Sequence, residues 1–171
     1  FVSGPMTVRT FIDTVYRADA DIDRLVKSLD LTDDQAKLAA LAAEVSLDDQ
    51  APVIQLVNRV VSQAMRDRAS DIHIEPMDEE LRVRFRIDGH LVEAFNLPMG
   101  VHPALISRLK IMSGMNIVEK RRPQDGQFST NIDGKDVDVR VASVATVFGE
   151  KIVMRILDKS RSMIGLAELG F

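Results

Sequence analysis

The sequence contains no cysteine, so disulfide bonds and thiolate metal sites are excluded, which fits a reducing compartment. It also lacks the run of about 18 apolar residues that a bilayer-spanning helix needs, and its start has no signal-peptide pattern. The 9 glycines are scattered singly, so no glycine-rich phosphate loop of the Walker type is present. We therefore expect a soluble protein without a complete nucleotide site, which reaches a membrane only through partner proteins.

Basic residues are scarce in the first part of the chain. Residues 1–50 carry 5 Lys and Arg against 10 Asp and Glu, whereas residues 51–171 carry 17 against 16. Neither part has a cluster of basic residues of the kind that binds the phosphate backbone of nucleic acids, so nucleic acid is not expected as a partner. With 46% hydrophobic residues, the chain is able to bury one real core.

The chain divides at a polar break that ends at Pro52, where a proline suits the first turn of a new helix. Before the break, apolar residues recur at helical spacing. We therefore expect residues 1–50 to be the helical tail of a preceding domain plus a connector. Residues 51–158 are expected to form one domain and residues 159–171 a linker, within a longer polypeptide.

Residues 51–158 alternate between helical and strand patterns. The predicted elements are an amphipathic helix over 53–65, a short strand at 72–74, a hairpin over 81–95, a helix from about 103, a hairpin over 128–141 and a strand over 151–157. The two hairpins turn at Asp88–Gly89 and Asp133–Gly134, pairs that tolerate positive φ. This order indicates an α+β fold with a mostly antiparallel sheet and helices against one face.

Metal binding and catalysis find little support in the sequence. His73, His90 and His102 lie far apart without a second ligand at helical spacing, so structural roles are favoured over a metal site. Asp71 and Glu75 flank a short predicted strand and have the residue types of an acid/base pair. A solvated strand edge accounts for these two carboxylates without chemistry, and we favour that interpretation.

Arginines recur at alternate positions of the predicted strands, opposite apolar residues. They are Arg82, Arg84, Arg86, Arg140 and Arg155. Guanidinium groups on a rigid sheet suit carboxylate or phosphate oxygens. The alternative is a solvated polar face with cross-strand ion pairs to residues such as Asp136 and Asp138, and spacing alone favours it. Residues 121–126 are predicted to be a loop rich in hydrogen-bond donors.

Six segments resemble, in order and in spacing, the ATPases of type II secretion and type IV pilus assembly. They are APVIQLVNRVV at 51–61, ASDIHIEP at 69–76, RFRIDG at 84–89, SRLKIMSGMNIVEKRRPQDGQ at 107–127, DVRVASVATVFGEKIVMRILD at 138–158 and LAELGF at 166–171. The likeness covers residues 51–171, and it is closer to the assembly and exporter branch than to the retraction branch.

The resemblance implies that residues 51–158 are a PAS-like domain, joined to a RecA-like ATPase domain whose Walker motifs follow residue 171. Such proteins form hexameric rings in the cytoplasm, hydrolyse ATP with Mg²⁺, and act through an inner-membrane platform protein. We expect this part alone to bind neither ATP nor Mg²⁺ and to hydrolyse nothing. Its partners would be its own ATPase domain, neighbouring subunits and the platform, which keeps it peripheral to the inner membrane.

In this family, arginines of the PAS-like domain reach the nucleotide phosphates as arginine fingers. Arg140 matches the arginine of the family's DxRVS-like strand and is the favoured phosphate contact. The arginine that closes the family's PQDGR segment is Gln127 here, and a neutral amide does not offset phosphate charge. Arg122 or Arg155 would then supply a second contact, or one contact is dispensable.

Two other functions remain open on the sequence. The domain would be a non-enzymatic docking module for a platform or adaptor protein, or a free-standing ligand-sensing domain. Relatives bind a membrane-anchored partner, or in some cases cyclic di-GMP, through the preceding domain. We do not predict cyclic di-GMP binding here, and the motifs do not separate pilus assembly from secretion.

Overall fold

The fold was analysed in a computed structural model that describes residues 22, 24, 52–132 and 134–158. The predicted linker at 159–171 lies outside these residues, as does nearly all of the predicted helical segment before residue 51. Within the described ranges, no helix has the length and apolar character needed to cross a bilayer.

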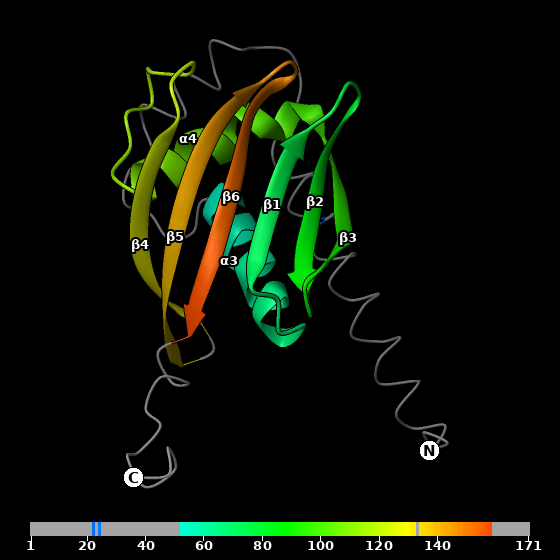
Figure 1. The fold of residues 1–171 in the computed structure, drawn as a ribbon, viewed down its shortest axis with the longest axis vertical. Coiled ribbons are helices and arrows are strands. Elements are labelled where there is room, and N and C mark those ends of the chain that lie inside the picture. Colours follow the sequence, from blue (N-terminus) through cyan, green and yellow to red (C-terminus); the bar gives the residue numbers. More distant parts are fainter. Residues whose placement is uncertain (1–21, 23, 25–51, 133, 159–171) are drawn as a thin grey trace, which may run out of the picture.

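A six-stranded antiparallel sheet forms the main layer (Figure 1). Its strands are β1 (Asp71–Pro76), β2 (Glu80–Ile87), β3 (His90–Pro98), β4 (Gln124–Ile132), β5 (Lys135–Thr146) and β6 (Gly149–Asp158). Their order across the sheet is β3-β2-β1-β6-β5-β4. The sheet therefore consists of two three-stranded meanders, joined where β1 pairs with β6.

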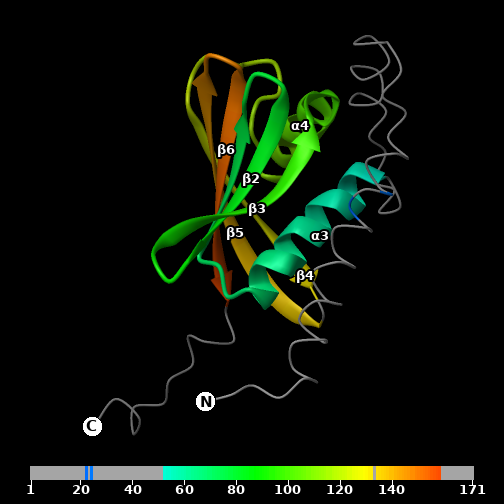
Figure 2. The same ribbon diagram turned by 90° about the vertical axis from the view of Figure 1, so that its right-hand side faces the viewer.

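Two helices cover one face of this sheet, and no helix in the described ranges covers the other, which we call the open face (Figure 2). Helix α3 (Pro52–Arg66) begins at a proline, whose missing N–H costs nothing in the first turn. Helix α4 (His102–Met112) follows a short 3₁₀ turn, η1 (Met99–Val101), and connects the two meanders. The side of α3 that faces the sheet is apolar, as its helical spacing predicts.

The core lies between the helices and the sheet. Alternate strand residues point into it, among them Ile72, Val83, Phe85, Val139 and Met154, all at most 1% exposed. The rings of Phe85 and Phe95 meet edge to face, with their centroids 5.7 Å apart. Because strand side chains alternate, the intervening residues lie on the open face.

The structure confirms an α+β fold with an antiparallel sheet and helices on one face. Asp88 and Gly89 have φ of 49° and 84°, as a tight primed turn requires. Two details differ from expectation. Strand β4 already begins at Gln124, so the second half of the predicted 121–126 loop is strand. Strand β1 is central, not a solvated edge, because it pairs with both β2 and β6.

Candidate functional site

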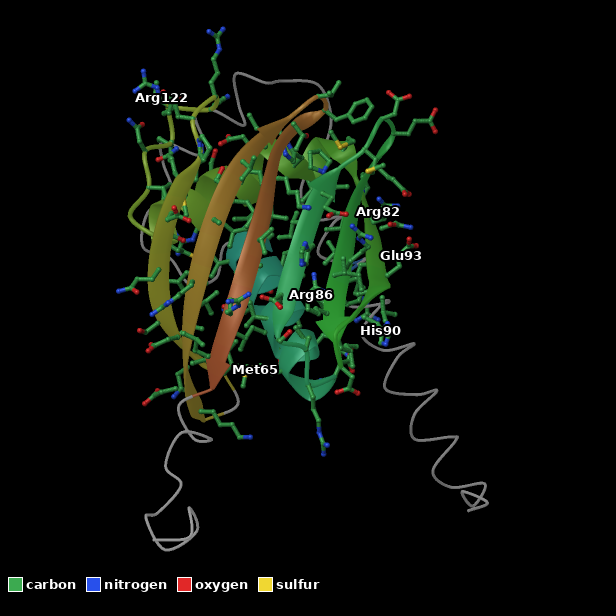
Figure 3. The ribbon with its side chains drawn as sticks, viewed as in Figure 1. Met65, Arg82, Arg86, His90, Glu93 and Arg122 are labelled. Carbon is green, nitrogen blue, oxygen red and sulfur yellow. The ribbon has the colours of Figure 1, made fainter. Side chains whose placement is uncertain are left out.

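Polar side chains cover the open face of the sheet, where Figure 3 shows Arg82 and Arg86 projecting from β2. Their acidic partners lie on the neighbouring strand β1. Glu75 is directly opposite Arg82, and Asp71 is opposite Arg86. Cross-strand ion pairs therefore exist, as the solvated-face interpretation expected.

The carboxylates in these pairs are Asp71 and Glu75, which are buried in a central strand. The solvated-edge interpretation of these two residues was therefore wrong. Of the carboxylates suggested as partners, Asp136 accepts a hydrogen bond from Asn131 at 2.7 Å and Asp138 accepts one from Ser129 at 2.6 Å.

Glu75 is the centre of a cluster of cations. Its side chain is 8% exposed, with Oε2 2.7 Å from Arg84 Nη2 and Oε1 2.7 Å from Lys151 Nζ. Arg82 is a more distant partner at 3.7 Å. Burial opposes ionisation, but the hydrogen bonds and charges of Arg84 and Lys151 outweigh it and lower the pKa of Glu75 to about 2. Glu75 is therefore ionised and fully paired, which is unsuited to a general acid or base.

This pairing predicts acid-sensitive stability. The pKa of Glu75 lies below its unfolded value of 4.5, so its stabilisation is complete above pH 4.5 and is lost as the pH falls to about 2. We expect the free energy of unfolding to fall by about 2 to 3 kcal/mol over that range from this residue. Urea titrations followed by circular dichroism would measure it. Glu75→Gln should lack this component, and an equal pH dependence in both proteins would contradict the prediction.

One row of side chains crosses the open face through five strands. From β2 to β4 it runs Arg86, Asp71, Arg155, Arg140 and Gln127, each directly opposite the next in the strand register. Arg155 Nε donates to Asp71 Oδ1 at 2.9 Å. On the other side, Arg86 Nε lies 3.4 Å from Asp71 Oδ2. The row therefore contains three guanidinium groups and one carboxylate.

Arg140 and Arg155 are brought together at the centre of this row. Directly opposite residues on antiparallel strands have Cβ atoms about 5 Å apart, and like charges there repel. No described residue forms an ion pair with Arg140, which is exposed. Both arginines line an open hollow of about 530 Å³. Two adjacent cations, one of them unpaired, favour an anion between them.

The floor and rim of the hollow come from β1, β4, β5 and β6. Besides the two arginines, its lining residues are Asp71, Asp125, Gly126, Gln127, Val141, Ala142 and Val153. Gln127 therefore lies beside Arg140, at the position where the family resemblance implied an arginine. The two arginines are balanced by the carboxylates of Asp71 and Asp125, so the placement of each charge decides what the hollow binds.

Arg122 does not join the row. It is exposed in the loop between α4 and β4, and Figure 3 shows it at one end of the sheet, away from Arg86. Its backbone N–H donates to Glu119 Oε1 at 3.1 Å. Of the three arginines predicted as phosphate contacts, the structure brings Arg140 and Arg155 together and leaves Arg122 apart.

The three histidines lie in unrelated places. Nε2 of His102 is 2.8 Å from the carbonyl oxygen of Glu150, and His90 is exposed at the β2–β3 turn. His73 is buried, burial lowers its pKa, and neither ring nitrogen has a hydrogen-bond partner within the described ranges. No group of three or more potential metal ligands occurs among the described residues.

Sequence reasoning missed a buried ion pair on the helix side of the sheet. Lys110 of α4 is 1% exposed and pairs with Glu150 of β6. Its ammonium also donates to the carbonyl oxygen of Glu119 at 2.6 Å, and Ser143 Oγ donates to Glu150 Oε1 at 2.9 Å. Helical spacing could have predicted the burial of Lys110, because it lies four residues after the buried Ile106 and therefore on the same side of the helix. The pair ties α4 to the β5–β6 hairpin.

The row places the guanidinium groups of Arg140 and Arg155 next to each other beside an open hollow. Comparison with known proteins gives the family of the chain. The family model "Type II/IV secretion system protein" matches residues 46–171, and the chain belongs to this family.

Relatives within the family carry more specific names. The type IV pilus assembly ATPase PilB of Myxococcus xanthus is 43% identical over 160 residues, which cover 93% of this chain and 27% of that protein. The type II secretion system protein E of Xanthomonas campestris is 48% identical over 140 residues, covering 82% of this chain and 24% of that protein. The chain thus spans about a quarter of the length of these relatives.

A solved structure, the Legionella pneumophila ATPase DotB, matches with a TM-score of 0.44 and 15% identity, covering 68% of this chain and 32% of that one. At this level of similarity it adds nothing to the account of the site.

Proposed function

We propose that this chain is part of an ATP-hydrolysing motor for type IV pilus assembly or type II secretion, and that it supplies arginine contacts to ATP phosphates. The observation that carries the proposal is the unpaired guanidinium of Arg140 beside Arg155 in an open hollow. Guanidinium groups match phosphate oxygens with paired donors and stay charged at any physiological pH. The names of two relatives, a pilus assembly ATPase and a type II secretion protein, support the motor.

The wider assembly is part of the same proposal. The domain over 51–158 is the PAS-like domain of a hexameric, cytoplasmic ring, in which it meets an ATPase domain and neighbouring subunits. An inner-membrane platform protein is the partner at the membrane. We assign phosphate oxygens to the hollow, and Mg²⁺ accompanies ATP in the intact protein.

The Arg140→Ala variant of the full-length polypeptide tests the proposal. We expect ATP turnover to fall by at least about tenfold, because loss of one preorganised donor removes charge stabilisation in the transition state while Arg155 remains nearby. Arg82→Ala is the matched control, since Arg82 lies on the same face but outside the hollow. Unchanged turnover in Arg140→Ala would overturn the proposal, and so would ATP hydrolysis by the 171-residue chain alone.

A second candidate function is docking of a platform or adaptor protein without a role in hydrolysis. It is favoured by the apolar tip of the β5–β6 hairpin, where Val147 is 94% exposed and Phe148 47%. Exposed apolar groups of this kind mark contact surfaces when they cluster. Docking alone would leave ATP turnover intact in the Arg140→Ala variant.

A further inference from the structure

Asp71 occupies the junction between the two meanders. It lies on β1 between Arg86 of β2 and Arg155 of β6, and its side chain is 7% exposed. Ser70 Oγ donates to its Oδ2 at 2.8 Å, while Arg155 Nε donates to its Oδ1 at 2.9 Å. Burial opposes ionisation, yet these hydrogen bonds and the nearby charges of Arg155 and Arg86 outweigh it and lower the pKa of Asp71.

The bond to Asp71 uses one particular donor of Arg155. An arginine presents five N–H donors, and Nε carries only one of them. With Nε held, the two terminal nitrogens stay free to meet a ligand, and the Arg155 side chain is 67% exposed. A long exposed side chain otherwise samples many rotamers and loses that freedom when it binds. Because Asp71 already restricts Arg155 before a ligand binds, it lowers the conformational entropy that binding costs.

We infer that Asp71 is a positioning residue, which holds the Arg155 guanidinium beside Arg140 so that the two arginines form a paired site for phosphate oxygens. The inference rests on the proposed function. It also accounts for Gln127: the second cation of the site comes from β6, on one side of Arg140, while the neutral amide lies on the other side, on β4.

The sign of the effect separates positioning from simple charge. A carboxylate near an anion repels it, so removing its charge should tighten anion binding. If Asp71 orients Arg155, removing its charge should instead weaken binding. Asp125 is the matched control, because it lines the same hollow yet has no ion pair or hydrogen bond to an arginine among the described residues.

ATP itself is expected to need the ATPase domain, so the experiment titrates the 171-residue chain with sodium tripolyphosphate, which probes the arginines alone, by isothermal calorimetry. Asp71→Asn is expected to weaken binding by about two- to tenfold, the lower part of the range of coupling between residues in contact. Asp125→Asn is expected to bind equally or more tightly. Ser70→Ala keeps every charge and loses only the hydroxyl that fixes the Asp71 carboxylate, so it should weaken binding by about twofold. Ser70 is exposed, so this variant serves even if Asp71→Asn does not fold.

A double-mutant cycle tests whether Asp71 acts on anion binding through Arg155. In an Arg155→Gln background, Asp71→Asn should no longer weaken tripolyphosphate binding, whereas in an Arg86→Gln background the weakening should persist. Tighter or unchanged binding by both Asp71→Asn and Ser70→Ala overturns the inference, as does a weakening by Asp71→Asn that survives in Arg155→Gln. If tripolyphosphate binding is insensitive to both Arg140→Ala and Arg155→Gln, the proposed function itself fails.

Discussion

The Lys110→Met variant is expected to lose about 3 to 5 kcal/mol of unfolding free energy, which is the cost of leaving one partner of a buried ion pair alone. Lys110 and Glu150 are 1% and 7% exposed, so water does not replace the lost ammonium. The variant also removes the bond from Lys110 to the carbonyl oxygen of Glu119, which holds the loop before β4. Urea denaturation of the chain, followed by circular dichroism, gives the difference directly.

The double variant Lys110→Met/Glu150→Leu is the control for this prediction. Replacing both members of a buried pair with apolar groups of similar volume is often nearly neutral. We therefore expect it to recover most of the stability lost in Lys110→Met. A single variant within about 1 kcal/mol of the wild type would show that the pair is not buried as the structure describes.

Gly126→Ala is expected to destabilise the fold by about 2 to 3 kcal/mol, at the upper end of what overpacking costs. A Cβ at this position would lie 2.2 Å from the backbone oxygen of Ser113, at the end of α4. A backbone carbonyl is not free to move aside, so β4 must shift and carry the adjacent Gln127 away from Arg140. Thermal unfolding measures the first effect, and a weaker response to tripolyphosphate measures the second.

Gly89→Ala separates steric from conformational effects. Gly89 has φ of 84°, and an added Cβ would have nothing within 4 Å. The substitution is therefore destabilising only because alanine disfavours the left-handed backbone, by about 1 kcal/mol. It lies in the β2–β3 turn and should leave tripolyphosphate binding unchanged. Equal losses in the two variants would contradict the clash assigned to Gly126.

Local patterns in the sequence were sufficient to predict the elements of the fold. Alternation along 81–87, the Asp88–Gly89 pair and the apolar spacing of 53–65 each depend on near neighbours in the chain, and the structure agrees with all three. Burial of Asp71 and Glu75 could not be predicted in this way. It depends on which strands pair, and Asp71 meets Arg155 across 84 positions of sequence.

The candidate site could be predicted only in part for the same reason. The arginines at alternate positions were visible, and Arg140 was favoured through family resemblance. That Arg155 lies beside Arg140 while Arg122 does not follows from the register of β5 and β6. Register is set by the whole core and the turn lengths, which no short segment contains.

The pairing of β1 with β6 joins the two meanders, and we expect it to form after each meander has folded. Each meander pairs strands that are neighbours in sequence, and such contacts form early because little chain has to be closed. A chain in which only the β4–β5–β6 half has folded carries both Arg140 and Arg155 but lacks the carboxylate of Asp71 that orients one of them. On our proposal, such a half-folded chain would therefore hold an anion more weakly than the finished domain.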